Sequence, residues 1–209
     1  MSVSRIALMV VLLVCLLAVS FPAAAATPAD QDAEQEKRIA EYTAIINKNP
    51  NDAVAHYFRG LVYAARKDFP SALRDLTKAV ELNPRYAAAF FNRGWVYSRM
   101  DDDAQNIDKA IEDYTRAIAL DPSYGLVYTF RAYVYNKKEM YDQAIADCDK
   151  ALELGVRHTG NYFYKAKAQE KKGQYEAAIA TMRQLMAATN DKLAIEEAKS
   201  IIRSLGGTL

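Results

Sequence analysis

The sequence predicts an all-α protein built as a solenoid, in which similar helical hairpins stack one after another. A block of about 34 residues recurs four times along the chain. Each block carries two segments whose apolar residues recur at helical spacing, and Pro or Gly stands between segments where the chain must turn. Because such hairpins bury their apolar faces only against their neighbours, we expect one continuous array.

The first residues of the chain are typical of a secretory signal peptide. Arg5 precedes an apolar run from Ile6 to Val19, and Ala23 to Ala26 offer small residues to a signal peptidase. The apolar run is shorter than the roughly 20 residues of a membrane-spanning helix. We therefore expect cleavage after Ala24 to Ala26 and an exported protein, periplasmic or secreted. The alternative is an uncleaved N-terminus that anchors the chain in the inner membrane.

The repeated pattern is clearest in the first segment of each block. The stretch His56–Tyr63 recurs as Phe90–Tyr97, as Tyr128–Tyr135 and, more loosely, as Tyr162–Gln169. Small residues lie midway along these segments, at Gly60, Gly94, Ala132 and Ala166. The second segments carry their own small residues on one helical face, such as Ala72 and Ala79. We expect each mid-helix small residue to face an alanine of the second helix, so that the two backbones approach closely.

These patterns set the expected order of elements along the chain. We expect a signal peptide (1–26), an N-terminal capping helix (27–52), repeats at 53–86, 87–124, 125–158 and, in degenerate form, 159–190, and a C-terminal capping helix (191–209). Terminal helices with a polar outer face are needed because the end repeats lack one neighbour. The second repeat has extra residues within Asp101 to Asn106, which predict a polar loop inside its hairpin.

The charge balance excludes two classes of partner. The chain has 27 Lys and Arg against 26 Asp and Glu, and removal of residues 1–26 takes away one Arg and no acid. A neutral chain without dense basic clusters gives no electrostatic reason to bind nucleic acid or an anionic membrane surface. We expect a membrane contact only if the N-terminal segment stays uncleaved. The mature chain keeps one cysteine, Cys148, so no intramolecular disulfide forms.

No residue pattern predicts catalysis, a cofactor or a metal site. His56 and His158 lack Cys or acid at ligand spacing, and His56 stands in a column of aromatic residues. Cys148 occupies a core position of its second helix, which favours a buried thiol. The run Asp101–Asp103 lacks the glycine and distal Glu of a calcium loop, so we expect a solvated loop with a helix N-cap. Phosphate-binding and nucleophile motifs are absent from the sequence. We therefore expect a protein that is not an enzyme.

Charged residues recur at a constant spacing that suggests ion pairs. Four acids each lie 18 residues before a cation, in the pairs Glu41 and Arg59, Asp75 and Arg93, Asp113 and Arg131, and Asp147 and Lys165. The midpoint of each interval falls on a turn residue such as Pro84. Antiparallel helices folded about that point bring equidistant residues to the same height. We therefore predict that each pair ties a second helix to the first helix of the next repeat. The alternative is that these charges are separately solvated.

The mid-helix small residue, the Tyr three residues later, the alanines of the second helix and the terminal Pro together resemble the tetratricopeptide repeat. The resemblance covers most of the chain, from residue 53 to the end of the fourth block. It implies a right-handed superhelix whose concave face is lined by the first helices and receives extended or helical peptides. One departure is a cation directly before the small residue, where the family commonly has an apolar side chain.

By this resemblance, ten residues would line the concave groove. They are Tyr57, Leu61, Phe91, Trp95, Arg99, Tyr133, Lys137, Phe163, Lys167 and Lys171. For each aromatic residue, a place in the core between repeats remains the alternative. Some family members grip a C-terminal carboxylate with a set of Lys and Asn side chains. Most of the corresponding positions here are apolar or aromatic, as at Leu126 and Phe130, so that clamp is mostly missing.

The leading hypothesis is an exported scaffold or adaptor that holds a partner protein or peptide in this groove. The alternative is a membrane-tethered structural or assembly component of the cell envelope that acts by self-association.

Overall fold

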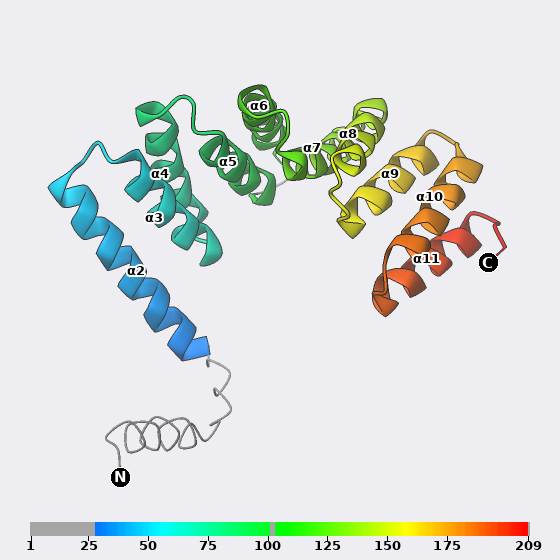
Figure 1. The fold of residues 1–209 in the computed structure, drawn as a ribbon, viewed down its shortest axis with the longest axis horizontal. Coiled ribbons are helices and arrows are strands. Elements are labelled where there is room, and N and C mark those ends of the chain that lie inside the picture. The colour runs from blue at the N-terminus through cyan, green and yellow to red at the C-terminus, as the bar shows by residue number, and fades with distance from the viewer. Residues whose placement is uncertain (1–27, 101–102, 209) are drawn as a thin grey trace, which may run out of the picture. The chain divides into compact units, whose positions relative to one another are not determined.

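The computed structural model describes residues 28–100 and 103–208, and it confirms the all-α prediction. These residues form ten helices and no strand (Figure 1). The chain divides into two units, Met1–Arg38 and Ile39–Leu209. The described part of the first unit is the beginning of α2 (Pro28–Lys48). The predicted signal peptide lies outside the described residues. Among the described helices, none has the length and apolar character that a membrane span requires.

The second unit contains the end of α2, then a row of helical hairpins and a single last helix (Figure 1). The first helices of the hairpins are α3 (Ala53–Ala65), α5 (Ala87–Arg99), α7 (Gly125–Lys137) and α9 (Thr159–Lys171). The second helices are α4 (Phe69–Leu82), α6 (Ala104–Leu120), α8 (Tyr141–Glu153) and α10 (Tyr175–Ala188), and α11 (Lys192–Ser204) closes the row. Each second helix packs against its own first helix and against the helix that follows.

Local sequence signals explain where these helices begin and turn. The Asp52 carboxylate accepts hydrogen bonds from the backbone N–H groups of Val54 and Ala55 at 3.0 and 2.9 Å, which caps α3. Pro70 lies in the first turn of α4, where its missing N–H costs nothing. Three hairpin turns place a residue in the left-handed backbone region, at Lys67, Glu139 and Gly173. Only the last of these turns carries the residue best suited to that conformation.

The mid-helix glycines bring the two helices of the first two hairpins together, although the side chains nearest to them are not alanines as expected. A Cβ atom added at Gly60 would lie 3.0 Å from Cγ of Leu76, and one at Gly94 would lie 3.0 Å from Cε1 of Tyr114. The facing side chains are therefore large core residues of the second helix. They fill the space that a glycine leaves, which explains why Leu76 and Tyr114 are fully buried.

The extra residues of the second repeat lengthen a helix more than they extend a loop. Ala104 to Asn106 form the first turn of α6, which has 17 residues where α4 has 14. Asp103 caps this helix, because its carboxylate accepts from the N–H of Gln105 at 3.0 Å. The predicted N-cap is thus confirmed, whereas the polar loop is shorter than predicted. Residues 101–102 lie outside the described part.

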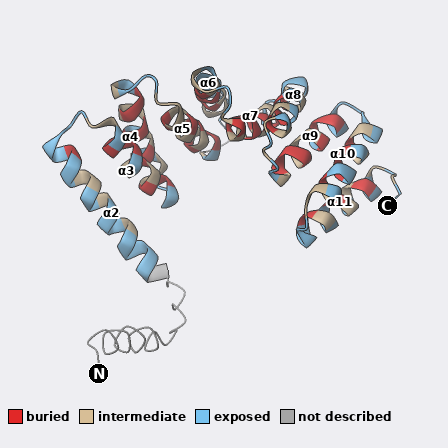
Figure 2. Cartoon of the chain, in the orientation of Figure 1, coloured by how far each residue is buried: buried red, intermediate tan, exposed pale blue. Residues whose placement is uncertain are grey.

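The first helices form the inner side of the row. Neighbouring first helices contact one another, as α3 with α5, α5 with α7 and α7 with α9. Among the described elements, no comparable contact joins one second helix to the next. Buried residues lie where helices face each other, and exposed residues lie on the outer sides of the helices (Figure 2). The last helix, α11, buries Ala194, Ala198 and Ile202 against this core, although Leu193 is 83% exposed.

Candidate functional site

The first helices of the first three repeats are held in place by ion pairs within the repeat. Arg59 donates from Nε to Oδ2 of Asp75 at 2.7 Å and from Nη2 to Oδ1 at 2.8 Å. Two-bond pairs of the same kind join Arg93 to Asp113 and Arg131 to Asp147. Burial raises the pKa of the Asp147 carboxyl, and the facing guanidinium offsets part of this rise. The predicted pairing between successive repeats is therefore wrong, although six of the eight predicted residues do form ion pairs with one another.

The hydrogen bond of the remaining guanidinium nitrogen, Nη1, shows why the predicted register of the ion pairs was wrong. Nη1 of Arg59 donates to Thr43 at 3.0 Å, that of Arg93 to Thr77 at 3.5 Å, and that of Arg131 to Thr115 at 3.0 Å. The partner on the preceding helix thus lies 16 residues back, so the helices fold about the residue after the proline. Residues two apart on a helix point to nearly opposite sides, because successive side chains turn by about 100°. The aspartates therefore face their own repeat and the threonines face the next one.

The two remaining members of the predicted set follow this corrected register. Glu41 is exposed, and no ion pair joins it to another residue in the described part. Lys165 pairs with Asp149 at 2.6 Å, again 16 residues back, and not with Asp147. In the fourth repeat Thr181 stands where the other repeats have aspartate, and its hydroxyl donates to Oε1 of Gln169 at 2.8 Å. In the fourth repeat, the acid that pairs with the cation therefore lies on the preceding helix and not on the second helix of the same repeat.

Three hollows follow one another along the first helices. The first has a volume of about 350 Å³ and lies over α3, α5 and α7. Its lining is almost entirely apolar: Leu61, Ala64, Ala65, Phe91, Asn92, Trp95, Leu126 and Phe130. The Trp95 ring is partly exposed there, with the Phe69 ring 6.5 Å away and the guanidinium of Arg99 5.5 Å from its centroid.

The second hollow is smaller and polar. It measures about 60 Å³ and is lined by Ser98, Arg99, Phe130, Tyr133 and Tyr164. The Tyr133 and Tyr164 rings lie 5.4 Å apart at an angle of 48°. Burial raises the pKa of Tyr164, so its hydroxyl keeps its proton and remains a hydrogen-bond donor at neutral pH.

The third hollow lies between α9 and α11 and has a volume of about 420 Å³. It combines apolar side chains with Lys167, Lys171, Glu170 and Glu197. Phe130 lines both the first and second hollows, and Tyr164 lines both the second and third. Neighbouring hollows therefore adjoin along the first helices, and we call the three together the inner groove.

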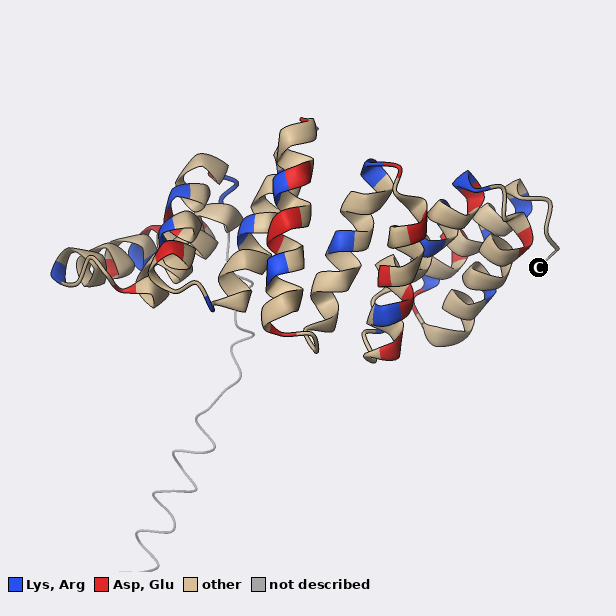
Figure 3. Cartoon of the chain, turned by 90° about the horizontal axis from the view of Figure 1, so that it is seen from above, with Lys and Arg blue, Asp and Glu red and all other residues tan. Residues whose placement is uncertain are grey.

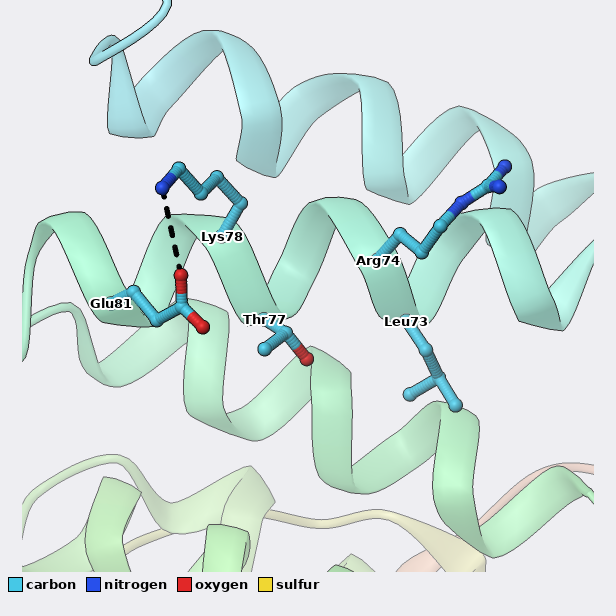
Figure 4. Close-up of a pocket in the computed structure, with 5 residues that line it drawn as sticks. All are labelled: Leu73, Arg74, Thr77, Lys78 and Glu81. Carbon is cyan, nitrogen blue, oxygen red and sulfur yellow. Dashed lines mark ion pairs between the residues drawn. The ribbon is translucent and has the colours of Figure 1, made fainter.

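The second-helix side of the row has hollows of a different kind. Figure 4 shows one of about 380 Å³ that is lined only by residues of α4, including Leu73 and Arg74. An ion pair of 3.6 Å joins Lys78 to Glu81 across it. Another, of about 440 Å³, surrounds Phe90, whose ring is contacted by the guanidinium groups of Arg93 and Arg116. The first is confined to one helix and the second to one hairpin, so neither extends over several repeats.

Comparison with known proteins gives the family. Sequence models of the tetratricopeptide repeat match residues 53–86, 101–155 and 160–191, which together are more than half of the chain. The chain belongs to the tetratricopeptide repeat family. No curated protein matches its sequence.

Solved structures share the fold of this tetratricopeptide repeat protein. A crystal structure of MamA superposes with a TM-score of 0.68 at 21% identity, covering 85% of this chain and 90% of the other. The crystal structure of YrrB, a TPR protein with an unusual peptide-binding site, gives 0.69 at 18% identity, covering 80% and 84%. A thermophilic TPR protein of Thermus thermophilus gives 0.64 at 19% identity, covering 84% and 92%.

Eight of the ten residues predicted for the tetratricopeptide groove line the three hollows. Leu61, Phe91 and Trp95 line the first, Arg99 and Tyr133 the second, and Phe163, Lys167 and Lys171 the third. Whether they bind a partner stays a prediction.

Two predicted groove residues lie elsewhere in the repeat array. Tyr57 belongs to the core between repeats, because its ring packs 4.7 Å from Tyr86 and its hydroxyl accepts from Nδ2 of Asn92 at 3.1 Å. Its assignment to the groove is therefore wrong. Lys137 lies beside the groove, with Nζ 5.1 Å from the centroid of the Tyr133 ring.

The ten predicted lining residues leave out one column that lines the groove. Asn92, Phe130 and Tyr164 each lie two positions before the small residue of their helix, and all three line the groove. The sequence did carry a signal for this column. Its residues are polar or aromatic in every repeat, whereas the core-facing side of an amphipathic helix is expected to be more apolar.

The residues considered for catalysis or metal binding have roles in packing and hydrogen bonding. Cys148 is fully buried, and burial raises the pKa of its thiol to about 12. Both ring nitrogens of His56 lie 3.1 Å from an oxygen, one of Asp75 and one of the Pro50 carbonyl. The described residues contain no cluster of His, Cys, Asp and Glu that could hold a metal ion.

Proposed function

We propose that this tetratricopeptide repeat protein is an interaction scaffold that holds a segment of a partner protein along the inner groove. The observation that carries the proposal is the succession of three adjoining hollows along the first helices, in which Phe130 and Tyr164 each line two neighbours. A track of adjoining hollows over several repeats fits an extended segment, whereas a compact ligand would need one enclosed site.

The chemistry of the groove supports a protein partner. Partly exposed Trp95, Phe130 and Tyr133 provide the kind of apolar and aromatic area that dominates protein interfaces. Arg99, Lys167 and Lys171 form no ion pair with any described residue, so they remain available to an acidic partner. On the described helices seen in Figure 3, cations and acids are interspersed. YrrB, a protein of the same fold, is described as having a peptide-binding site.

The test begins with selection of peptides from a random library on the purified protein, followed by affinity measurements on the strongest binder. Removal of an interface aromatic commonly costs about 2 kcal/mol or more, so Trp95→Ala should weaken binding at least roughly 30-fold. Phe130→Ala should act in the same direction, because its ring belongs to two of the hollows.

Leu73→Ala is the matched control. Leu73 packs against the same core as Trp95 but lines the hollow on α4 (Figure 4). It should lower the thermal midpoint to a similar degree and leave peptide affinity within about twofold, since it touches no part of the inner groove. Equal loss of affinity in both variants would trace the effect to stability and contradict the proposal.

We also propose that the protein is exported and acts after removal of its first residues. The proposal rests on the composition of residues 1–26, which lie outside the described part. N-terminal sequencing of the protein from cell fractions tests it. A mature start near Ala25 to Thr27 in a soluble envelope fraction is the expected result. An intact N-terminus in the membrane fraction would favour the tethered alternative instead.

A further inference from the structure

The middle of the inner groove gathers hydrogen-bond donors that have no acceptor. The guanidinium of Arg99 stacks over Trp95, at 5.5 Å from the ring centroid, and pairs with no carboxylate in the described part of the chain. The hydroxyl groups of Tyr133 and Tyr164 likewise donate to no described residue. All three side chains line the same 60 Å³ hollow, and no acid is among its lining residues.

The remaining polar group of this hollow is already engaged. Ser98 is 6% exposed, and its hydroxyl donates to the Trp95 carbonyl at 2.8 Å. The same hydroxyl accepts a hydrogen bond from the Tyr114 hydroxyl at 3.5 Å. The hollow therefore offers one cationic and two neutral donors with their acceptors missing. Arg99 is exposed and both tyrosines are partly exposed, so the three donors are open to an acceptor from outside, and a charged acceptor forms the stronger bonds.

The size of the hollow limits what enters it. An engineered protein cavity of about 150 Å³ binds a benzene ring. At about 60 Å³ this hollow holds a group of the size of a carboxylate and excludes an aromatic side chain. The hollows on either side, of about 350 and 420 Å³, are several times larger and accept whole side chains.

We propose that the hollow between Arg99, Tyr133 and Tyr164 binds the side-chain carboxylate of an Asp or Glu in the bound partner segment. This inference rests on the proposed function of the inner groove. The carboxylate comes from the interior of the segment, because the groove continues on both sides of the hollow through Phe130 and Tyr164. The segment thus carries an apolar anchor for the first hollow, then an acid, and then residues that lie against α9 and α11.

Peptide selection tests this inference separately from the proposed function. Two random libraries are used, one with the peptide inserted between two protein domains and one with a free C-terminus. We expect the inserted library to yield peptides with an apolar residue followed at a fixed distance by Asp or Glu. Peptides with apolar anchors but no acid preference would overturn the inference and leave the scaffold function standing. Acid selected only as a free C-terminus would also overturn it. If neither library yields binders, both proposals fail.

Affinity measurements on one selected peptide then locate the acid. Replacing its acid by the amide should weaken binding to the wild type about tenfold or more, as loss of a charge-assisted contact does. The same replacement should change binding to the Arg99→Gln, Tyr133→Phe, Tyr164→Phe triple variant by less than about twofold, because the three receiving donors are gone. These substitutions keep the approximate size of the side chains, and an unchanged thermal midpoint checks the fold. Arg74→Gln, on the hollow shown in Figure 4, is the matched cation control and should behave as the wild type. An equal effect of the acid in all three proteins would overturn the assignment.

Discussion

Arg131 and Asp147 face each other across the third hairpin, with Nε and Nη2 of the arginine 2.7 and 2.8 Å from the two carboxylate oxygens. The side chains are 14% and 8% exposed. Removing one partner of such a pair leaves a largely buried charge without its counterion, which costs about 3 to 5 kcal/mol. Asp147→Asn should therefore lower the free energy of unfolding by an amount in this range, measured by urea denaturation.

The exposed pair Lys150 and Glu153 provides the comparison on the same helix, at 40% and 69% side-chain exposure. Glu153→Gln should cost only about 0 to 1 kcal/mol, since water screens that pair. Equal small losses for both variants would show that the buried pair does not hold the hairpin.

The hairpin turns offer a test of backbone strain. Lys67 and Glu139 have φ values of 61° and 59°, where the equivalent residue of the fourth repeat is Gly173 at 73°. A side chain in this left-handed region costs about 1 to 2 kcal/mol, partly offset by the greater freedom of glycine in the unfolded chain. Lys67→Gly and Glu139→Gly should therefore stabilise the protein by up to about 1 kcal/mol.

The reverse change, Gly173→Ala, should destabilise the protein by a comparable amount, although a Cβ there would meet no atom within 4 Å. The thermal midpoints of the three variants, compared with that of the wild type, test these expected changes in stability. A loss of stability in both glycine variants would mean that the Lys67 and Glu139 side chains themselves stabilise the turns.

Cys148 should be inert in the folded protein. Burial raises the pKa of its thiol to about 12 from the ordinary 9.0, and only the thiolate attacks disulfide reagents. A rise in pKa lowers the thiolate fraction, by roughly 1000-fold at pH 8 for this shift. A chain with Cys15→Ser should therefore react with a chromogenic disulfide at least about 1000-fold more slowly when folded than in urea. Fast stoichiometric labelling of the native protein would contradict the core position of Cys148.

The cations of the groove should act mainly on the rate of association. Lys171 lines the third hollow and forms no ion pair with a described residue. Lys171→Glu should slow association of an acidic peptide, and the effect should shrink as salt is raised, because rim charges act through long-range steering. Stopped-flow measurements at two salt concentrations test this, with Lys78→Glu on α4 as the control. An effect seen only in the dissociation rate would mean that Lys171 makes a close contact instead.

The hairpins were predictable because their signals are local. Helical spacing, the cap at Asp52 and the proline in the first turn of α4 each act within a few residues. The register of the ion pairs was not predictable, since it depends on the residue at which the chain folds between two helices. A shift of one residue in that point, from Pro84 to the next residue, moves the partner by two positions and to the opposite side of the helix.

The division of aromatic residues between core and groove was likewise beyond the sequence. Tyr57 and Trp95 were both predicted to line the groove, but the ring of Tyr57 packs against Tyr86 while Trp95 stays partly exposed beside Arg99. This difference arises from packing between successive repeats, which residue spacing does not record. The second hollow depends on three helices at once, so its donors become neighbours only in the folded row.

The central claim is that the partner lies along the inner groove, and site-specific photocrosslinking tests it most directly. A photoreactive phenylalanine analogue is placed at Trp95 in one protein and at Arg74 in another, and each is irradiated with the selected peptide. We expect a crosslinked product from position 95 and none from position 74. A crosslink from position 74 alone would place the partner on the second-helix side and contradict the claim.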